Sequence, residues 1–197
     1  MARPRQVSDA DILDAARTCF LEHGPAVSTN VIADRLGISS AALFKRFGTK
    51  DQLMRDALMP TEDPDFVEML KVGPDDRPIV EQLRELALSM VRFFDRFTPC
   101  FATLRAAGVD LYEEMAKHPV PPPVQNHRLL VGWLRRAADS GRIRPIDCDA
   151  VASMVIGAVN GRSFLSHLGQ TPLGSPEGHV DAVVSVLWKG ICPEESP

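Results

Sequence analysis

Small, hydroxyl-bearing and basic side chains are concentrated between residues 39 and 50. DNA-reading helices begin with small residues, because these let the backbone approach the major groove. Lys and Arg nearby donate hydrogen bonds to phosphate oxygens. The residues that fit this pattern are Ser39, Ser40, Ala41 and Ala42, followed by Lys45, Arg46 and Lys50. Their types and spacing predict contact with nucleic acid.

Two short helices joined by a tight turn must position these side chains. Ser28 or Thr29 is expected to cap a helix that buries Ile32, and Gly37 ends it. Ser39 or Ser40 then begins the next helix, so the pair has helix-turn-helix geometry. The segment 49–52 reads Thr-Lys-Asp-Gln, a capping box that starts a further helix beside the basic residues.

Helical periodicity continues through the rest of the chain. A connector with a helical turn or two is expected over 60–78, and a long helix over about 79–97. Pro99 is expected to open a new helix, because proline removes a backbone donor. Further helices are predicted over 124–138, over about 149–168 from a cap at Asp147 or Asp149, and from Ser175-Pro176 onward. No stretch alternates with period two, so the fold class is all-α, with about nine helices.

Charge is distributed unevenly along the 197 residues. The formal net charge is −4, yet residues 1–50 carry +2, which leaves −6 on the remainder. Only the N-terminal segment is therefore expected to meet phosphate. No bilayer-spanning stretch or signal peptide is present, so we expect a cytoplasmic protein without a membrane partner. The four cysteines form no C-x-x-C pair, which argues against disulfides and zinc.

Catalytic motifs are absent from the sequence. It contains no G-x-S-x-G, phosphate-binding loop, dinucleotide fingerprint or H-E-x-x-H. The carboxylate pairs, such as Glu113-Glu114, are adjacent in sequence and do not converge on one helical face. We therefore expect no enzyme activity, no cofactor and no bound metal.

The stretch Ile12–Leu53 resembles the DNA-binding domain of the TetR family. Its most specific part is residues 43–53, Leu-Phe-Lys-Arg-Phe-Gly-Thr-Lys-Asp-Gln-Leu, where the family usually has Leu-Tyr-x-x-Phe-x-Ser/Thr-Lys-Glu/Asp-x-Leu. The resemblance implies a three-helix DNA-binding domain over 1–50 and a helical ligand-binding and dimerisation domain over 51–197. It also implies that Ser28 or Thr29, the aromatic Phe44, Lys45 and Lys50 contact DNA. Phe44 replaces the usual Tyr, so a phenolic donor to phosphate is lost, although the ring retains the ability to touch a thymine methyl.

The same resemblance implies a homodimer that binds a palindromic double-stranded operator, usually as a repressor. The last two helices of each subunit would form the interface, with glycines permitting close approach. The expected interface residues are Met154, Gly157, Ala158, Gly161, Leu165, Val180, Val184, Leu187 and Trp188. The alternative is that these helices only pack inside one subunit.

A small, largely apolar effector of unknown identity is implied as well. It would favour a dimer whose recognition helices are wrongly spaced for the operator. The expected ligand residues are Met90, Phe94, Phe97, Phe101, Tyr112, Met115, Trp133 and Asn160. An aromatic stripe at helical spacing is more often part of a solid core than of a pocket, so a ligand-independent DNA-binding protein, or an activator, is the alternative function.

Overall fold

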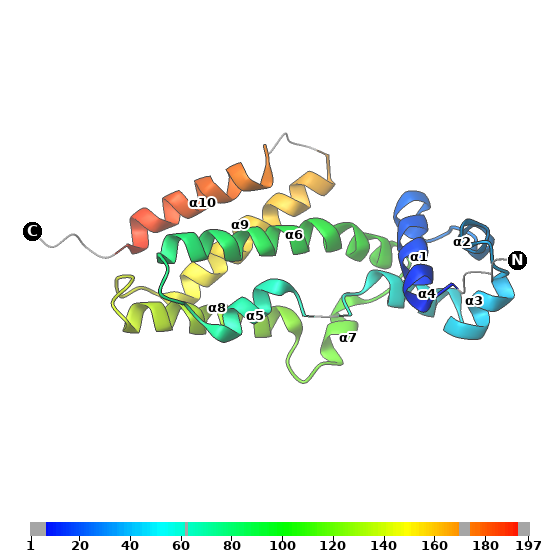
Figure 1. Ribbon diagram of the computed structural model, residues 1–197, viewed down its shortest axis with the longest axis horizontal. Coiled ribbons are helices and arrows are strands. Elements are labelled where there is room, and N and C mark those ends of the chain that lie inside the picture. Colours follow the sequence, from blue (N-terminus) through cyan, green and yellow to red (C-terminus); the bar gives the residue numbers. More distant parts are fainter. Residues whose placement is uncertain (1–6, 62, 170–173, 193–197) are drawn as a thin grey trace, which may run out of the picture. The chain divides into compact units, whose positions relative to one another are not determined.

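The computed structural model describes residues 7–61, 63–169 and 174–192 (Figure 1). Ten helices and no strands occur in these ranges, which confirms the all-α fold class. The helices are α1 (Asp9–His23), α2 (Thr29–Leu36), α3 (Ser40–Phe47), α4 (Lys50–Leu58), α5 (Asp65–Val72), α6 (Ile79–Ala106), α7 (Leu111–Ala116), α8 (Pro122–Asp139), α9 (Cys148–His167) and α10 (Pro176–Ile191).

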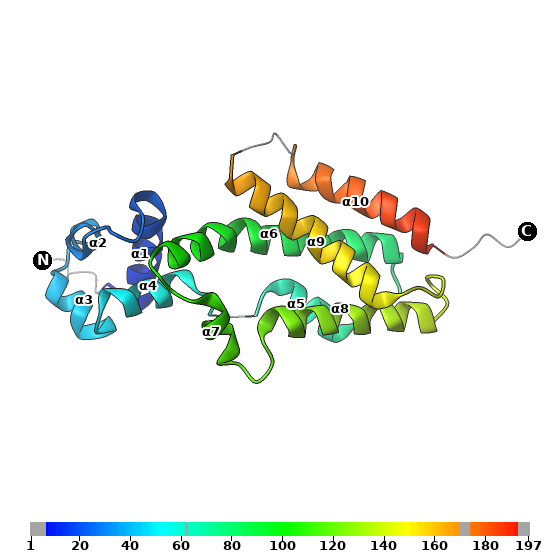
Figure 2. The ribbon, with the colours of Figure 1, turned by 180° about the vertical axis from the view of Figure 1, so that it is seen from behind.

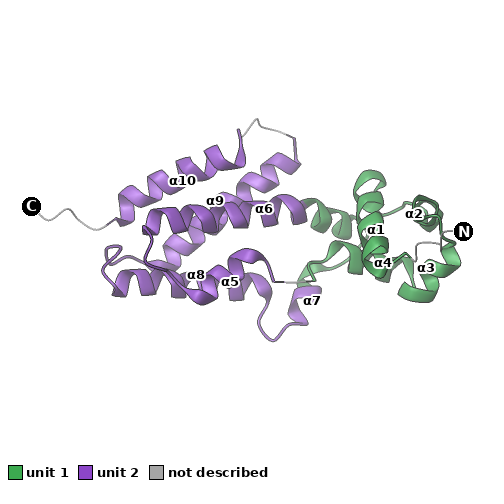
Figure 3. Cartoon of the chain, viewed as in Figure 1, with its two compact units in different colours: residues 1–61, 99–112 green, residues 62–98, 113–197 purple. Residues whose placement is uncertain are grey.

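The chain divides into two compact units (Figure 3). The first contains Met1–Thr61 and Pro99–Tyr112, and the second contains Glu62–Thr98 and Glu113–Pro197. The domain boundary that we predict after residue 50 falls just after the first residue of α4. The first compact unit differs from that range, because it also holds α4 and the C-terminal part of α6.

Helices α1 to α4 enclose a small apolar core. Ile12, Phe20, Ile32 and Leu43 are at most 1% exposed, because each helix turns its apolar stripe toward the others. Arg17 joins α1 to α4, since its Nε donates a 2.7 Å hydrogen bond to the carbonyl oxygen of Ala57. This core holds α3 in a fixed position within the unit.

Helix α6 runs through Pro99, which corrects the prediction of a new helix there. Proline removes the hydrogen bond that residue 99 would donate to the carbonyl of Asp95. The helix nevertheless continues, because Cys100 and Leu104 beyond the proline are fully buried, and packing outweighs the lost bond. The chain leaves the helix at Gly108, whose φ of +85° suits glycine.

The second unit is built around α8. Helix α8 packs against both α5 and α9, and α10 packs against α9 (Figures 1 and 2). Trp133, Leu130 and Leu134 on α8 are at most 1% exposed and form the centre of its core. The predicted helical turns in the connector are confirmed as α5, whose Phe66 and Leu70 join this core.

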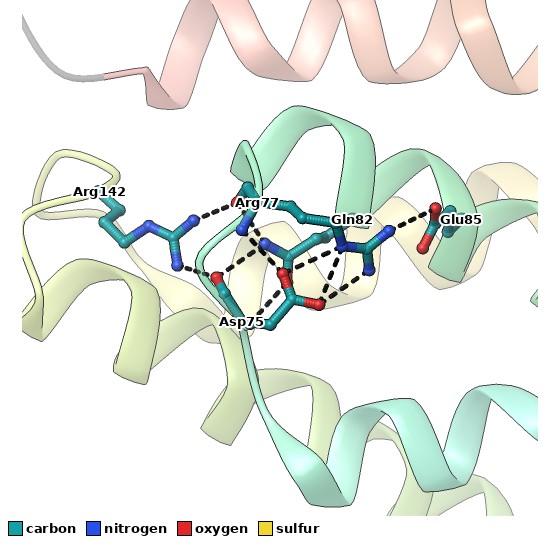
Figure 4. Close-up of polar contacts among 5 residues, drawn as sticks. All are labelled: Asp75, Arg77, Gln82, Glu85 and Arg142. Carbon is teal, nitrogen blue, oxygen red and sulfur yellow. Dashed lines mark hydrogen bonds and ion pairs between the residues drawn. The ribbon is translucent and has the colours of Figure 1, made fainter.

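A polar cluster fixes the turn that precedes α6 (Figure 4). The buried Gln82 accepts a 2.9 Å hydrogen bond from the amide of Asp75 and donates to the carbonyls of Asp75 and Arg77. Arg142 donates to the same two carbonyls, and the Arg77 guanidinium binds the Asp75 and Glu85 carboxylates at 2.9 and 2.8 Å. Hydrogen bonds from Arg77 lower the pKa of Asp75.

Candidate nucleic-acid interface

The turn between α2 and α3 has helix-turn-helix geometry. Gly37 has a φ of +66°, in the left-handed region that favours glycine after a helix. Its amide and that of Ile38 donate to carbonyls of the last turn of α2, at 3.2 and 3.1 Å. Ser39 then begins α3, since its side chain accepts a 3.2 Å hydrogen bond from the amide of Ala42. The sequence left Ser39 and Ser40 open as caps, and the structure selects Ser39.

One face of α3 is exposed and the opposite face is buried. Ala41, Phe44, Lys45 and Gly48 are exposed, and their spacing of three, four and seven residues places them on one side of the helix. The Phe44 ring is 43% exposed, whereas Leu43 on the other side is 1% exposed. A partly exposed ring and an ammonium group therefore share the surface that would enter a groove.

Two of the side chains whose hydroxyl groups we expect to contact DNA, Ser40 and Ser28, form hydrogen bonds with protein atoms. Ser40 donates to the side-chain oxygen of Asn30 on α2. Ser28 caps α2 by accepting a 3.2 Å hydrogen bond from the Asn30 amide, and it is exposed. Thr29, the first residue of α2, is partly buried. Ser28 and Thr29 stand together at the N-terminus of α2, where backbone amides would favour a phosphate.

The basic residues have two different environments. Lys45 is exposed and Lys50 is half-buried, and within the described ranges neither forms an ion pair with a carboxylate. Arg46, in contrast, binds the N-terminal end of α1, where its Nη1 contacts the carbonyl oxygen of Val7 at 2.7 Å and the carboxylate of Asp9 at 3.1 Å. Arg46 thus has a structural partner that sequence reasoning missed.

The start of α4 lies directly after the basic segment. Thr49 accepts a 3.0 Å hydrogen bond from the Gln52 amide, as the capping box predicts. The return half of the box is absent from the described contacts, because the Thr49 amide donates to the carbonyl of Phe47 at 2.8 Å, while the Gln52 side chain donates to Asp56 at 2.7 Å. Lys50 is therefore the first residue of a capped helix, where amide donors and an ammonium group adjoin.

The predicted ligand residues do not form one group. Met90 and Trp133 are each 1% exposed, whereas Tyr112 is 82% exposed and Asn160 is also on the surface. Phe93 stands at the centre of the aromatic contacts, with its ring centroid 4.9 Å from that of Phe97. Phe101 and Tyr112 belong to the first unit; the second unit holds Met90, Phe94, Phe97, Met115, Trp133 and Asn160.

Phe66 and Phe94 complete this aromatic cluster with edge-on contacts to Phe93 at 5.7 and 5.5 Å. A pocket of about 450 Å³ lies elsewhere in the second unit, lined by residues of α5, α6 and α8. Trp133 is the one predicted ligand residue in its lining. The aromatic cluster and the pocket are thus separate candidates for a ligand site.

The predicted interface residues on α9 and α10 divide by exposure. Met154 is 60% and Leu165 41% exposed, and Gly157 is on the surface while Ala158 and Gly161 are partly exposed. Val180 and Val184 are buried in the core of the second unit, so they offer no area to a partner. Leu187 and Trp188 are half-buried against that core. The sequence missed other exposed apolar residues of the same helices, namely Phe164, Leu168 and Val186.

Comparison with known proteins relates the N-terminal helices to a family of regulators. Residues 12–57 match the profile of the bacterial regulatory proteins of the tetR family. The transcriptional repressor BdcR of Escherichia coli is 27% identical over 116 residues, which are 58% of this chain and 59% of BdcR. The chain thus matches about three fifths of that relative's length.

Solved structures of regulators share the fold over nearly the whole chain. PfmR, a TetR-family regulator of Thermus thermophilus, is 22% identical, with a TM-score of 0.60 over 94% of this chain and 99% of its own. The complex of SmeT with triclosan is 21% identical, with a TM-score of 0.61 over 93% of this chain and 90% of SmeT. The profile match relates residues 12–57 to the tetR family, and the likeness to these solved structures shows that the chain has the fold of TetR-family regulators. Within the described ranges, every helix is too short or too polar to span a membrane.

Proposed function

We propose that this regulator binds a palindromic operator as a homodimer and represses transcription until a small, largely apolar ligand releases it. The observation that carries the proposal is the exposed face of α3, where Lys45 lies beside the small Ala41. Lys50 and the amide end of α4 follow directly, and both favour phosphate. The similarity to the repressor BdcR supports repression rather than activation.

Dimerisation is supported by an apolar surface on α9 and α10. Met154, Phe164 and Val186 are between 53% and 72% exposed. Large apolar side chains gathered on two neighbouring helices mark a protein-binding surface more often than a solvated one. A groove of about 980 Å³ continues this surface, with Met154 and Val186 among its lining residues together with Ile146. A second copy of the chain is the occupant that a palindromic site requires.

Ligand release is supported by the relative that was solved with triclosan, a small molecule. The rings of Phe66, Phe93, Phe94 and Phe97 provide apolar contacts within the second unit. A ligand that inserts among them would act by population shift, because it would stabilise only conformations in which the rings separate. The loss of operator affinity at saturating ligand could be no larger than the ratio of the ligand's affinities for the two conformations.

Selection from a random pool of double-stranded DNA tests operator binding. The full chain is expected to enrich a sequence with two inverted half-sites whose centres are about one helical turn, roughly 34–36 Å, or somewhat more apart. Failure to enrich any sequence would overturn the proposal. Enrichment of a single half-site would retain DNA binding and overturn the dimer.

A second experiment addresses the ligand. The fluorescent apolar probe 8-anilinonaphthalene-1-sulfonate is added to the complex of the chain with its selected DNA. We expect the probe to bind the folded chain and to lower its DNA affinity. If saturating probe leaves the DNA affinity unchanged, ligand release through an apolar site is contradicted, and the ligand-independent alternative is favoured.

A further inference from the structure

The exposed face of α3 carries an aromatic ring, whereas DNA-recognition helices commonly carry amide or guanidinium side chains there. Asn, Gln and Arg recognise bases through paired hydrogen bonds to base edges. On this face the ring of Phe44 is 43% exposed and the Ala41 methyl group is exposed one turn before it. Lys45 beside them is the amine that would neutralise phosphate. The arrangement favours apolar over hydrogen-bonded recognition.

Three other polar residues of this segment have contacts with protein atoms. Ser39 accepts from the amide of Ala42, and Ser40 donates its hydroxyl hydrogen to Asn30. Arg46 contacts Val7 and Asp9 through Nη1. Breaking any of these contacts to reach a base would offset part of the energy gained from the new contact. Ala41 and Phe44 are apolar and exposed, so they have no hydrogen bond to break before they meet a base edge.

We infer that Phe44, supported by Ala41, reads the C5-methyl groups of thymines in the operator; this inference rests on the operator binding proposed above. The thymine methyl is the apolar group that the major groove displays, and apolar side chains recognise it by contact. Residues three apart on a helix are neighbours, so the Phe44 ring and the Ala41 methyl group flank the same space. Phe44 has no hydroxyl group with which to donate to phosphate.

Replacing thymine by deoxyuridine tests the inference, because it removes the methyl group and keeps Watson–Crick pairing. The DNA selected by the wild-type chain is resynthesised with one thymine at a time changed to deoxyuridine. At one or two positions in each half-site we expect affinity to fall about three- to fivefold, the effect of one methyl group leaving an apolar contact. At the other positions affinity should be unchanged.

Variants assign the effect to the residue. Phe44→Ala is expected to bind thymine and deoxyuridine DNA equally, while Phe44→Tyr retains the ring and the discrimination. Lys45→Ala is the matched control, since losing a phosphate contact weakens binding to both DNAs by the same factor. Circular dichroism confirms that each variant is folded, and the exposure of Phe44 predicts that it is. The scan of the wild-type chain needs no variant and tests methyl recognition by itself.

The outcomes separate this inference from the function on which it rests. If the wild-type chain binds its selected DNA but no thymine responds to deoxyuridine, methyl recognition is overturned and operator binding stands. Discrimination that persists in Phe44→Ala would overturn the role of Phe44. Failure of the selection itself would overturn operator binding, and methyl recognition with it.

Discussion

The buried Arg162 of α9 forms an ion pair with the partly exposed Asp95 of α6, with Nη1 3.2 Å from the carboxylate. Ser163 donates a further hydrogen bond of 2.5 Å to the same carboxylate, and Arg162 donates to the carbonyl of Gly174 at 3.3 Å. The Arg162 side chain is only 6% exposed, so its charge depends on these partners. The ion pair therefore connects α9 to α6 within the second unit.

Asp95→Ala is expected to destabilise the second unit by about 2–3 kcal/mol, because it leaves a buried guanidinium unpaired. Asp181→Ala is the control: it removes the partner of Arg84 in an exposed pair and should destabilise the unit much less. Urea denaturation followed by tryptophan fluorescence measures the difference, since Trp133 and Trp188 both lie in this unit. Equal losses in the two variants would contradict the structural role of the pair.

The salt dependence of DNA binding tests the two lysines of the interface. Lys45→Ala combined with Lys50→Ala should weaken binding to all sequences roughly equally, and should lower the slope of log K against log salt by about two for each bound protomer. Lys71→Ala with Lys117→Ala removes the same charge from α5 and from beside α7 and should leave the slope unchanged. An unchanged slope in the first variant would contradict the phosphate assignment.

Local sequence signals predicted the helix starts, because their hydrogen bonds span at most three residues. Ser8 forms a capping box with Asp11, a Ser-x-x-Asp pattern that is visible in the sequence, and Ser175 caps α10 ahead of Pro176. Where the sequence left two candidates, the structure selects the earlier residue, as with Asp147 for α9. The turn between α2 and α3 was predictable for the same reason, since its pattern lies within a single stretch of chain.

Contacts between distant parts of the chain were not predictable in this way. Arg46 meets Asp9 across 37 residues and Arg162 meets Asp95 across 67, and nothing in either local sequence specifies the partner. The continuation of α6 through Pro99 depends likewise on the burial of residues beyond it. The exposure of Phe44 also required the structure, because the helical period alone does not say which face other helices cover.

The apolar surface of α9 and α10 predicts a stable dimer at micromolar concentration. Sedimentation equilibrium should give twice the 21.6 kDa mass of the chain. Met154→Glu is expected to yield monomers, because it places a charge on the surface to be buried, and Met154 is 60% exposed within the protomer. Val72→Glu, at an equally accessible apolar residue of α5, is the control that should remain dimeric. A monomeric wild-type chain would contradict the interface.

Acid sensitivity should depend on Asp75, whose pKa Arg77 holds below its ordinary value through hydrogen bonds. A lowered folded-state pKa means that the stabilisation is complete above the unfolded-state value of about 3.9 and is lost as the pH falls through the folded-state value. Asp75→Asn carries no charge at any pH, so it cannot lose this stabilisation on acidification. Between pH 5 and pH 2, a range of about three pH units around the unfolded-state pKa, its stability should therefore fall less than that of the wild-type chain. Urea midpoints across this range measure the difference.

Asp76→Asn is the control for this prediction. It removes a neighbouring carboxylate for which no such contact with Arg77 is described, and its stability should follow the wild-type curve. Parallel curves for Asp75→Asn and the wild-type chain would contradict the role of the Asp75–Arg77 pair in fixing the turn before α6.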